Sequence, residues 1–382
     1  MRIAGLISGT SYDGVDVAVV EFDLDGTTLH ARIALADTVP YPAEVVDALQ
    51  AAQHPRPVTA AAMARLDTLV GQAFAAAAAE ADSVAGPLAL LCSHGQTVYH
   101  WVDDDGRAKG TLQVGEPAWI AHATGVPVIS GVRAADIAAD GQGAPLVPLL
   151  DLLLLAGLDG NGPAAALNIG GIANLTVAAD PPLGYDTGPG NCLLDLIALE
   201  ATGRAYDVDG MLASQGTADT RVLGRLLADP YFARRPPKST GREHFDAAFL
   251  ARHRDALPPA DLAATLTALT AETIAAEVNR YGVRTLVASG GGIDNPVLRE
   301  MLADRIAGTS IHDSNWVGVP PEAKEAVLFA LIGWYSWHGL PAGVPSCTGA
   351  SATPVLGSFT PGSGPLRLPA PLDSAPERLV FD

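Results

Sequence analysis

The chain has 382 residues, 48% of them hydrophobic, with 40 glycines, 29 prolines and a formal net charge of −19. This length exceeds what one hydrophobic core usually serves, so two domains are expected, and the apolar content excludes a disordered protein. The acidic charge argues against nucleic acid or an anionic membrane as a partner, because no basic patch is present to neutralise phosphates. A small anionic substrate needs only a local pocket and is not excluded.

Three cysteines, Cys92, Cys192 and Cys347, lie far apart in the sequence. Their odd number and wide spacing argue against a disulfide framework or a cysteine-rich zinc site. The first residues enter a strand directly and show no signal-peptide pattern. The longest apolar stretch, residues 146–157, contains a proline and an aspartate and is too short to span a bilayer. We therefore expect a cytoplasmic protein.

The first 23 residues predict a β-hairpin with an unusual tip. Two apolar runs, residues 3–7 and 15–22, flank the segment from Ser8 to Gly14, which is rich in glycine and hydroxyl groups. An ordinary hairpin needs about two turn residues, so this tip is long. Glycine lets the backbone approach a ligand, and consecutive amides bind anions, so the tip can hold a phosphate. The alternative is a plain solvent-exposed turn.

Strands and helices then alternate along the chain. We expect strands at 29–39, 88–92, 111–114 and 126–130, and helices at 42–52, 60–81 and from 117 through 122. A second cycle has strands at 164–169, 173–177 and 285–289, helices at 192–202, 217–228 and 261–280, and a glycine-rich loop at 184–191. The alternation predicts mixed sheets flanked by helices. Residues 341–382, rich in proline and glycine, are expected to wrap irregularly over the surface.

Three glycine-rich turns each follow a strand, at 8–11, 168–171 and 289–292. None matches GxxxxGK[ST], and no GxGxxG opens a helix after the first strand, so neither a P-loop nor a Rossmann cofactor site is supported. The three turns together favour a nucleotide held between two domains. Residues 167–177 repeat the strand–turn–strand pattern of residues 3–20, which indicates a duplication with one turn facing the other across a cleft.

Asp186 lies among glycines and a proline just before a predicted helix. A carboxylate there can act as a general base, with Thr187 and Asn191 orienting a substrate. The alternative is that Asp186 caps the helix or stabilises it electrostatically. The DTGPGN loop is longer and richer in glycine than capping requires, which favours the base.

Polar residues also follow the first-half strands. Residues 93–97, Ser-His-Gly-Gln-Thr, can bind a sugar through hydroxyl and amide hydrogen bonds, although His94 is equally consistent with a satisfied core histidine. Arg133 can pair with a substrate carboxylate, although a surface ion pair is the commoner role. Further polar candidates are Glu116, Asp136, Glu322 and Glu325.

Nine segments between Gly5 and about Ala330 match one known family in order and spacing. They are GLISGTSYDGVDVAVV, CSHGQTVYH, TLQVGEPAWIA, DGQGAPLVPLLD, LNIGGIANLT, DTGPGNCLLD, PPKSTGREHF, SGGGIDNPVL and PPEAKEAVLFA. The chain thereby resembles the anhydro-N-acetylmuramic acid kinases, of the actin/hexokinase/Hsp70 superfamily. The resemblance implies a two-lobed α/β fold, a duplicated ribonuclease H-like arrangement with a mixed sheet in each lobe and a central cleft for ATP and sugar. The expected lobes are residues 1–133 and 134–340, followed by a wrapping segment at 341–382.

The resemblance also implies roles for individual residues. Asp186 is the expected general base, and Asp13 and Asp186 are the expected Mg²⁺ ligands, with Asp16 as a further candidate. The expected ATP-binding residues are Gly9, Thr10, Ser11, Tyr12, Asp13, Gly14, Val15, Asp16, Asn168, Gly170, Gly171, Gly290, Gly291 and Gly292. The expected sugar-binding residues are His94, Gln96, Thr97, Glu116, Arg133, Asp136, Thr187, Gly188 and Glu325.

The implied reaction is a double step of cell-wall sugar recycling. Asp186 takes a proton from water as the water opens the 1,6-anhydro bridge, and the released 6-oxygen attacks the γ-phosphate of ATP, giving N-acetylmuramic acid 6-phosphate and ADP. Phosphoryl transfer of this kind relies on positioning and on charge neutralisation by Mg²⁺. Such kinases often form dimers, so the resemblance leaves room for a homodimer.

One departure from the wider superfamily concerns the first turn. Related sugar kinases usually carry an aspartate there, in the pattern DxGT, whereas this chain has Ile7-Ser8-Gly9-Thr10, as the family it resembles does. Other functions on the same fold are a nucleotide hydrolase, a kinase for a different sugar, and a non-catalytic nucleotide-binding regulator. An intact Asp186 disfavours the regulator, which needs no base beside the phosphates.

Overall fold

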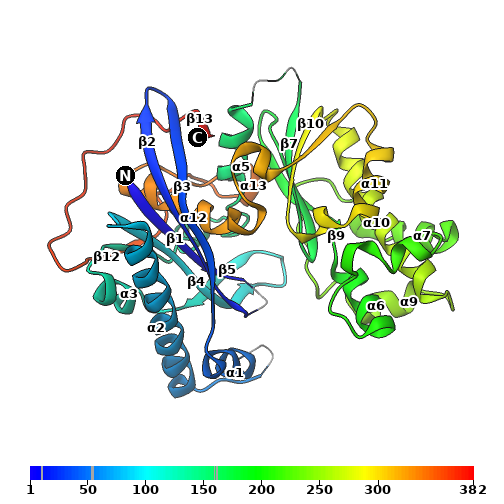
Figure 1. Ribbon diagram of the computed structural model, residues 1–382, viewed down its shortest axis with the longest axis horizontal. Coiled ribbons are helices and arrows are strands. Elements are labelled where there is room, and N and C mark those ends of the chain that lie inside the picture. Colours follow the sequence, from blue (N-terminus) through cyan, green and yellow to red (C-terminus); the bar gives the residue numbers. More distant parts are fainter. Residues whose placement is uncertain (10–11, 53–55, 159, 161) are drawn as a thin grey trace. The chain divides into compact units, whose positions relative to one another are not determined.

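The computed structural model describes residues 1–9, 12–52, 56–158, 160 and 162–382 (Figure 1). Contacts within the chain divide it into two compact units. Unit 1 comprises residues 1–157 and 318–382, and unit 2 comprises residues 158–317. Each unit is built around one mixed β-sheet.

The sheet of unit 1 has the strand order β12-β6-β4-β1-β2-β3-β13, and β5 pairs with β4. Its strands are β1 (Arg2–Ser8), β2 (Gly14–Asp25), β3 (Thr28–Pro40), β4 (Leu90–Val102), β5 (Ala108–Val114), β6 (Val128–Ser130), β12 (Ser358–Thr360) and β13 (Arg378–Phe381). β1, β2 and β3 form an antiparallel meander, and β4 runs parallel to β1. The predicted hairpin at the start of the chain is therefore confirmed.

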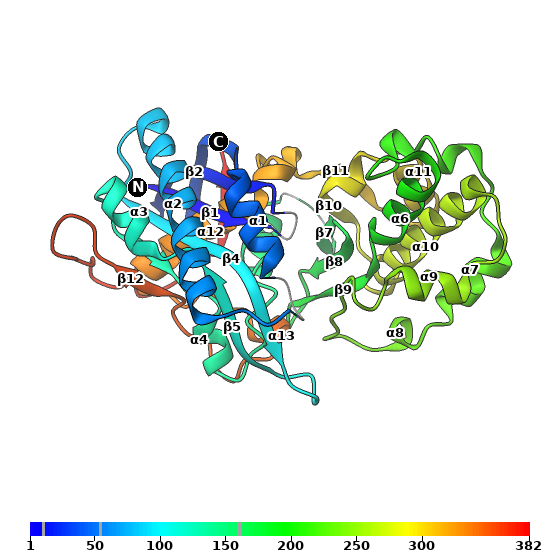
Figure 2. The same cartoon turned by 90° about the horizontal axis from the view of Figure 1, so that it is seen from below.

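Helices cover both faces of this sheet, and α2 and α12 are the main ones (Figures 1 and 2). The helices of unit 1 are α1 (Ala43–Ala51), α2 (Ala60–Ala85), α3 (Pro117–Thr124), α4 (Ala134–Ala138), α5 (Pro148–Ala156), α12 (Lys324–Trp337) and α13 (Pro345–Thr348). Strand residues such as Leu6 pack against Val70 and Phe74 of α2. On the other face, Gly5 lets the backbone of α12 rest directly on β1, where a Cβ would meet the carbonyl of Ala326.

The sheet of unit 2 has the strand order β11-β10-β7-β8-β9. Its strands are β7 (Ala164–Ile169), β8 (Ile172–Val177), β9 (Leu183–Pro189), β10 (Thr285–Ser289) and β11 (Ser310–Asp313), and its helices are α6 (Cys192–Thr202), α7 (Thr220–Leu227), α8 (Pro230–Ala233), α9 (Ala247–His253), α10 (Pro259–Arg280) and α11 (Pro296–Arg305). α10 and α11 pack on one face of the sheet, through residues such as Ile274 and Leu302. The opposite side of α10 joins α6, α7 and α9 in a second core.

The two sheets share one topology, which confirms the predicted duplication. In each unit the first three strands form an antiparallel meander. Two later strands, β4 and β6 in unit 1 and β10 and β11 in unit 2, continue the sheet in parallel beyond the first strand. This order, 3-2-1-4-5 within each unit, is that of the ribonuclease H-like sheet expected from the sequence. Because short antiparallel connections and right-handed crossovers limit how such strands can be arranged, the same element order yields the same sheet twice.

Three local predictions need correction. β4 does not end at Cys92 but continues to Val102, because residues 96–102 pair with β5. The segment 184–189 is not a loop but most of strand β9, since it pairs with β8. The tail after residue 341 is mostly irregular, yet β12 and β13 add strands to the sheet of unit 1.

The two units do not coincide with the lobes expected from the sequence, which divided the chain at 133/134 and 340/341. Residues 134–157 and 318–340 belong to unit 1, because α12 packs on β1, β2 and β4. A buried ion pair of 2.7 Å between Lys324 of α12 and Asp151 of α5 joins the same two segments. In the part of the chain that the structure describes, no helix is long and apolar enough to cross a membrane.

Gly5→Ala should destabilise unit 1, because the added methyl group would collide with the backbone of α12 rather than with a movable side chain. We expect the free energy of unfolding to fall by about 3 kcal/mol, the upper end of the cost of overpacking. Urea unfolding followed by circular dichroism measures it. Gly364→Ala, where no atom lies within 4 Å of the new methyl group, is the matched control. Equal stability of the two variants would contradict the packing argument.

Candidate functional site

Four polar residues form a row across neighbouring strands of unit 2. Ser289 of β10 pairs with Asn168 of β7, Asn168 with Asn174 of β8, and Asn174 with Asp186 of β9. Residues paired across a sheet project their side chains from the same face. The neighbouring residues Leu167 and Leu175 project from the other face, into the core with α10 and α11. The predicted base therefore shares a sheet face with the asparagine of the second glycine turn.

Asp186 is held by the segment that follows α8. Its Oδ2 accepts hydrogen bonds from Ser239 Oγ and from the Thr240 N–H, both at 2.9 Å. Its main chain is also fixed, since its N–H donates to the Lys238 carbonyl (3.2 Å) and its carbonyl accepts from Tyr231 (2.7 Å). Among the described residues, no hydrogen bond reaches Oδ1. The described residues thus leave the hydrogen-bonding capacity of this second carboxylate oxygen unused.

The pKa of Asp186 is raised above its ordinary value, mainly because the surrounding protein desolvates the carboxylate. The hydrogen bonds from Thr240 and Ser239 oppose this rise, the charge of Glu243 adds to it, and Lys238 opposes it. A partly desolvated carboxylate with a raised pKa is more basic than an exposed one, as general-base catalysis requires.

Behind Asp186 lies a buried ion pair. Lys238 Nζ lies 3.3 Å from Glu277 Oε1 of α10, and both side chains are at most 4% exposed. Tyr185 and Arg280 contact the other oxygen of Glu277, each at 3.0 Å. The ammonium group also lies 5.0 Å from the ring centre of Tyr231. These contacts fix Lys238, whose carbonyl in turn receives the main-chain N–H of Asp186.

The glycine turns of unit 2 pack backbone against backbone. The carbonyl of Gly170 accepts from the Asn191 N–H (2.8 Å), and that of Gly171 accepts from the N–H groups of Gly190 and Cys192. A Cβ on Gly190 would collide with the Gly170 carbonyl. Gly290, with φ of +82°, would place a Cβ 2.7 Å from Asn168 Oδ1. The second turn, the third turn and the start of α6 are therefore brought together, as the prediction of a nucleotide site requires.

In unit 1 the hairpin tip lies beside the middle of β4. Ser8 pairs with Gln96, and Gln96 Nε2 donates to the Gly9 carbonyl at 3.1 Å. Ser8 Oγ and Gln96 Oε1 are buried, and neither has a hydrogen-bond partner among the residues described. Tyr12 adopts a φ of +57°, which is uncommon for a residue with a side chain. The predicted ATP contacts Thr10 and Ser11 lie outside the described residues.

Two carboxylates flank this tip. Asp13 is exposed, and Asp16 on β2 accepts a 2.6 Å hydrogen bond from Thr38 Oγ1. Burial raises the pKa of Asp16, the bond from Thr38 lowers it, and the charge of Asp13 raises it further. Among the described residues, no three His, Cys, Asp or Glu side chains gather as a metal site. One or two carboxylates with water and phosphate oxygens nevertheless suit Mg²⁺, so Asp13 and Asp16 fit that ion.

The predicted sugar contacts His94, Arg133 and Glu325 form one cluster in unit 1. Arg133 Nε donates to His94 Nε2 at 2.8 Å, and His94 Nδ1 lies 3.0 Å from the Gly95 carbonyl. Burial lowers the pKa of His94 to about 3, and the Arg133 charge lowers it further, so the imidazole is neutral. Desolvation raises the pKa of Glu325, and the Arg133 guanidinium opposes that rise. His94 is thus a satisfied buried histidine that orients Arg133.

Other predicted contacts serve the fold where the structure places them. Asp136 is fully buried and accepts from the Gly143 N–H (2.7 Å) and Thr348 Oγ1 (2.8 Å). Glu116 caps α3 by accepting from the Ala118 N–H. Thr187 is buried and donates to the Ala173 carbonyl. These placements do not favour direct sugar contacts for Asp136 or Thr187.

Four further predicted residues have the following surroundings. Val15 is buried in the core of unit 1, so only its backbone is available to ATP. Thr97 Oγ1 accepts from Gln113 Nε2 at 3.1 Å. Gly188, paired with Ala173, packs against Phe232. Gly291 has no atom within 4 Å of the position of a Cβ, so its surface is open.

Sequence reasoning missed the residues that hold Asp186. Ser239 and Thr240 lie in the PPKSTGREHF segment, which carried the family resemblance but received no role. Asn174, in the row with Asp186, lies in the LNIGGIANLT segment and likewise received none. A sequence signal for these residues is the polar run of lysine, serine, threonine and arginine between two prolines and a phenylalanine, at residues 236–245.

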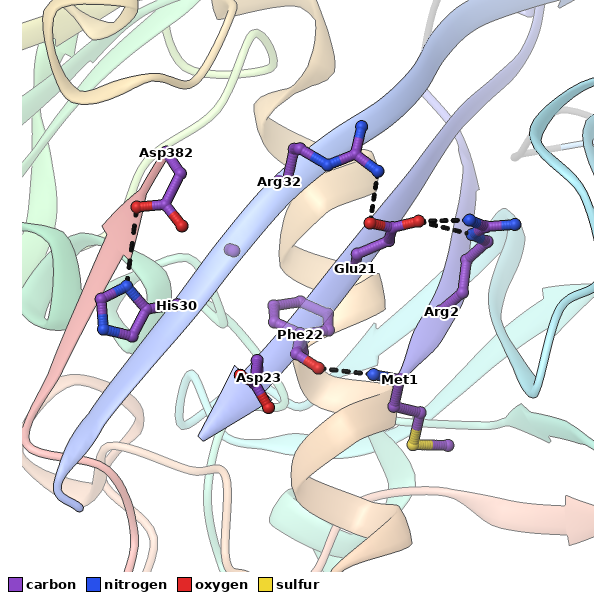
Figure 3. Close-up of a pocket in the computed structure, with 9 residues that line it drawn as sticks. Met1, Arg2, Glu21, Phe22, Asp23, His30, Arg32 and Asp382 are labelled. Carbon is purple, nitrogen blue, oxygen red and sulfur yellow. Dashed lines mark hydrogen bonds and ion pairs between the residues drawn. The ribbon is translucent and has the colours of Figure 1, made fainter. Parts of the chain in front are cut away.

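A pocket of about 460 Å³ lies at the other end of the unit 1 sheet (Figure 3). None of the predicted site residues lines it. Most of its charged side chains pair with one another: Glu21 lies between Arg2 and Arg32, and His30 lies 3.6 Å from Asp382. The pocket joins the two chain ends, since Met1 and Asp382 both line it.

The duplicated sheet and its glycine turns place the chain in the actin/hexokinase class of α/β proteins. The family model "Anhydro-N-acetylmuramic acid kinase" matches residues 1–362. Proteins of that name from Streptomyces coelicolor, Rhodococcus erythropolis and Xanthomonas campestris are 47%, 43% and 40% identical. These alignments cover 99%, 100% and 94% of this chain and 98%, 100% and 96% of the relatives.

The chain therefore belongs to the anhydro-N-acetylmuramic acid kinase family, as the sequence motifs indicated. It is a kinase, and its co-substrate is ATP.

His94 should make stability depend on pH. The pKa of an unfolded histidine is about 6.5. Burial lowers the pKa of folded His94 to about 3, so the folded protein does not bind this proton between these two pH values. Stability should therefore fall as the pH drops below about 6.5, by about 1.4 kcal/mol per pH unit for this one group. In His94→Gln, which keeps an acceptor for Arg133, urea unfolding between pH 7 and 5 should show a correspondingly smaller loss. His122→Gln, on the exposed side of α3, should keep the wild-type slope, and equal slopes in all three proteins would contradict the inference.

Proposed function

We propose that this chain opens the 1,6-anhydro ring of anhydro-N-acetylmuramic acid and transfers the γ-phosphoryl group of ATP to its 6-oxygen. The products are N-acetylmuramic acid 6-phosphate and ADP. The relatives' shared name supports the sugar, and the surroundings of Asp186 support the ring opening. The observation that carries the proposal is the carboxylate itself: one oxygen is fixed by Ser239 and Thr240, and the other has no hydrogen bond among the described residues.

In this mechanism Asp186 acts as the general base. Its free oxygen takes one proton from a water molecule as the water oxygen bonds to the anomeric carbon. The bond between that carbon and the 6-oxygen breaks, and its electron pair stays on the 6-oxygen. The 6-oxygen then bonds to the γ-phosphorus as the bond to ADP breaks, and Asp186 later releases its proton to solvent. Water, sugar and ATP thus give the sugar phosphate, ADP and one proton.

The glycine turns provide the phosphate contacts of the proposal. The expected backbone contacts to ATP are Gly9 and residues 12–16 in unit 1, with Gly170, Gly171 and Gly290–Gly292 in unit 2, because glycine lets a ligand approach the main chain closely. Asp13 or Asp16 would hold Mg²⁺, which would supply positive charge to neutralise the phosphates. Bulk water must be kept away from the γ-phosphate, because water would otherwise accept the phosphoryl group in place of the 6-oxygen of the sugar.

The sugar contacts are the least constrained part of the proposal. Arg133, oriented by His94 and near Glu325, offers a cation to the acidic group of the muramic acid. Gln96 and Thr97 lie on the same strand as His94. The pathway of cell-wall recycling, a cytoplasmic location and a homodimer remain predictions from the family resemblance.

Mass spectrometry of the products tests the function. Incubation with ATP, Mg²⁺ and the anhydro-sugar in H₂¹⁸O should give N-acetylmuramic acid 6-phosphate with ¹⁸O at the anomeric carbon. Asp186→Asn should lower kcat by about 10²–10⁴-fold, the usual contribution of a general base, while ATP affinity by calorimetry stays unchanged. Asp304→Asn, an exposed position on α11, is the control. ADP without a phosphorylated sugar would indicate a hydrolase, and phosphorylation of another sugar alone would also refute the proposal.

Ser239→Ala should move the pH dependence of the enzyme. The Ser239 hydrogen bond favours the ionised form of Asp186 and lowers its pKa. Without it the pKa rises further, so the acidic limb of the kcat/KM profile should shift to higher pH. Ser214→Ala, whose hydroxyl bonds the Met211 carbonyl instead, should leave the profile in place. An unshifted limb in Ser239→Ala would show that another group titrates there.

A further inference from the structure

The segment 236–245 links the proposed base to the second glycine turn. At one end, the N–H of Thr240 bonds the carboxylate of Asp186 on β9. Two residues later, the side chain of Arg242 reaches Gly171, which itself bonds the N–H groups of Gly190 and Cys192 just beyond the end of β9. Thr240 and Arg242 therefore lie near the two ends of the same short stretch of chain, residues 186–190.

The guanidinium of Arg242 rests against a residue that has no side chain. Its Nε and Nη2 lie 2.6 and 2.7 Å from the position that a Cβ on Gly171 would occupy. The turn does not need the arginine, because the carbonyls of Gly170 and Gly171 already accept N–H groups from residues 190–192. Glycine at 171 thus makes room for the arginine, and hydrogen bonding of the turn does not explain why the arginine is there.

Among the described residues, no acidic side chain forms an ion pair with Arg242. Arg242 is exposed, and its guanidinium makes no ion pair or hydrogen bond with the residues that the structure describes. Its charge acts on the first turn of α6, where it opposes the rise that burial gives to the pKa of Asp195, to about 6. An arginine with five unused donors beside a glycine turn and a helix start is suited to bind a phosphate oxygen pair.

We propose that Arg242 contacts the phosphoryl group in transfer and stabilises the charge on its oxygens. The inference rests on the proposed function, because Asp186 marks the acceptor side and the turn at 168–171 the donor side of that group. An arginine supplied within the chain can serve this purpose in phosphoryl transfer, since the charge on the equatorial oxygens develops most in the transition state. The γ-phosphorus exchanges its bond to ADP for a bond to the 6-oxygen, and Arg242 gives up no proton in the step.

Two other roles for Arg242 make different predictions. If it binds the acidic group of the sugar, its loss should raise the KM for the sugar and leave kcat nearly intact. If it only stabilises the loop, its loss should lower the melting temperature and impair ATP binding and kcat together. A contact formed mainly in the transition state should instead lower kcat and leave ground-state binding nearly unchanged.

Kinetics of Arg242→Ala, Arg242→Gln and Arg242→Lys distinguish these roles. We expect kcat to fall about 10³-fold in Arg242→Ala and Arg242→Gln, with sugar KM and ATP affinity within about threefold of wild type. Arg242→Lys should recover part of kcat, and guanidinium ions added to Arg242→Ala should restore part of it. Arg221→Ala, which breaks a surface ion pair with Asp255, is the control with unchanged kcat.

Two results would overturn the inference: a kcat within about threefold of wild type in Arg242→Ala, or a rise in sugar KM alone. A loss of kcat that accompanies a lowered melting temperature and is not rescued by guanidinium would also overturn it. The wild-type product keeps this test separate from the function. If the wild type makes no sugar phosphate, the proposed function fails, whereas normal wild-type turnover with an active Arg242→Ala refutes only the role of Arg242.

Discussion

The site in unit 2 depends on the direct contact between two glycine-containing stretches of backbone. Gly190 has no side chain, so the carbonyls of Gly170 and Gly171 can accept the N–H groups at the start of α6. This contact joins the end of β9 to the β7–β8 turn. Because Asp186 lies on β9, pairing of β9 with β8, including the register shift between Gly188 and Asp186, sets its distance from the turn. Any residue with a Cβ at 190 would push the proposed base and the proposed phosphate turn apart.

The carboxylate of Asp186 is balanced between two opposing effects. Desolvation raises the pKa of the carboxylate, and the hydrogen bonds donated by Thr240 and Ser239 oppose that rise. The buried pair of Lys238 and Glu277 contributes mainly by position, because the carbonyl of Lys238 receives the N–H of Asp186. A buried ion pair is weak evidence for stability, since desolvation offsets much of its attraction. Its presence directly behind the base is better explained by the need to hold one strand conformation.

The strands and glycine turns could be predicted from the sequence, whereas the residues that contact Asp186 could not. Hydrophobic runs and glycines located β1, β2, β7, β8 and β10, since these features depend on neighbours in the chain. The polar stretch after Cys92 and the segment 184–189 were misassigned because pairing with β5 and β8, which is not local, makes them strands. Burial of Lys238 depends on Glu277 and Tyr185, which lie in distant segments of the chain. Likewise, α12 packs on β1 through a contact between Gly5 and Ala326, which are 321 residues apart in the sequence.

The two halves use the same sheet but differ at the first turn. In unit 2 the β7–β8 turn is short, and its carbonyls are occupied by the start of α6. In unit 1 the corresponding tip spans residues 9–13, and Ser8 and Gln96 beside it keep buried oxygens without partners among the residues described. Buried polar atoms are costly unless a ligand or water satisfies them. The carbonyls of the unit 2 turn are therefore hydrogen-bonded within the chain, whereas buried oxygens beside the unit 1 tip have no partner among the described residues. In the proposed function, serine at position 8 in place of a carboxylate adds no negative charge beside the phosphates.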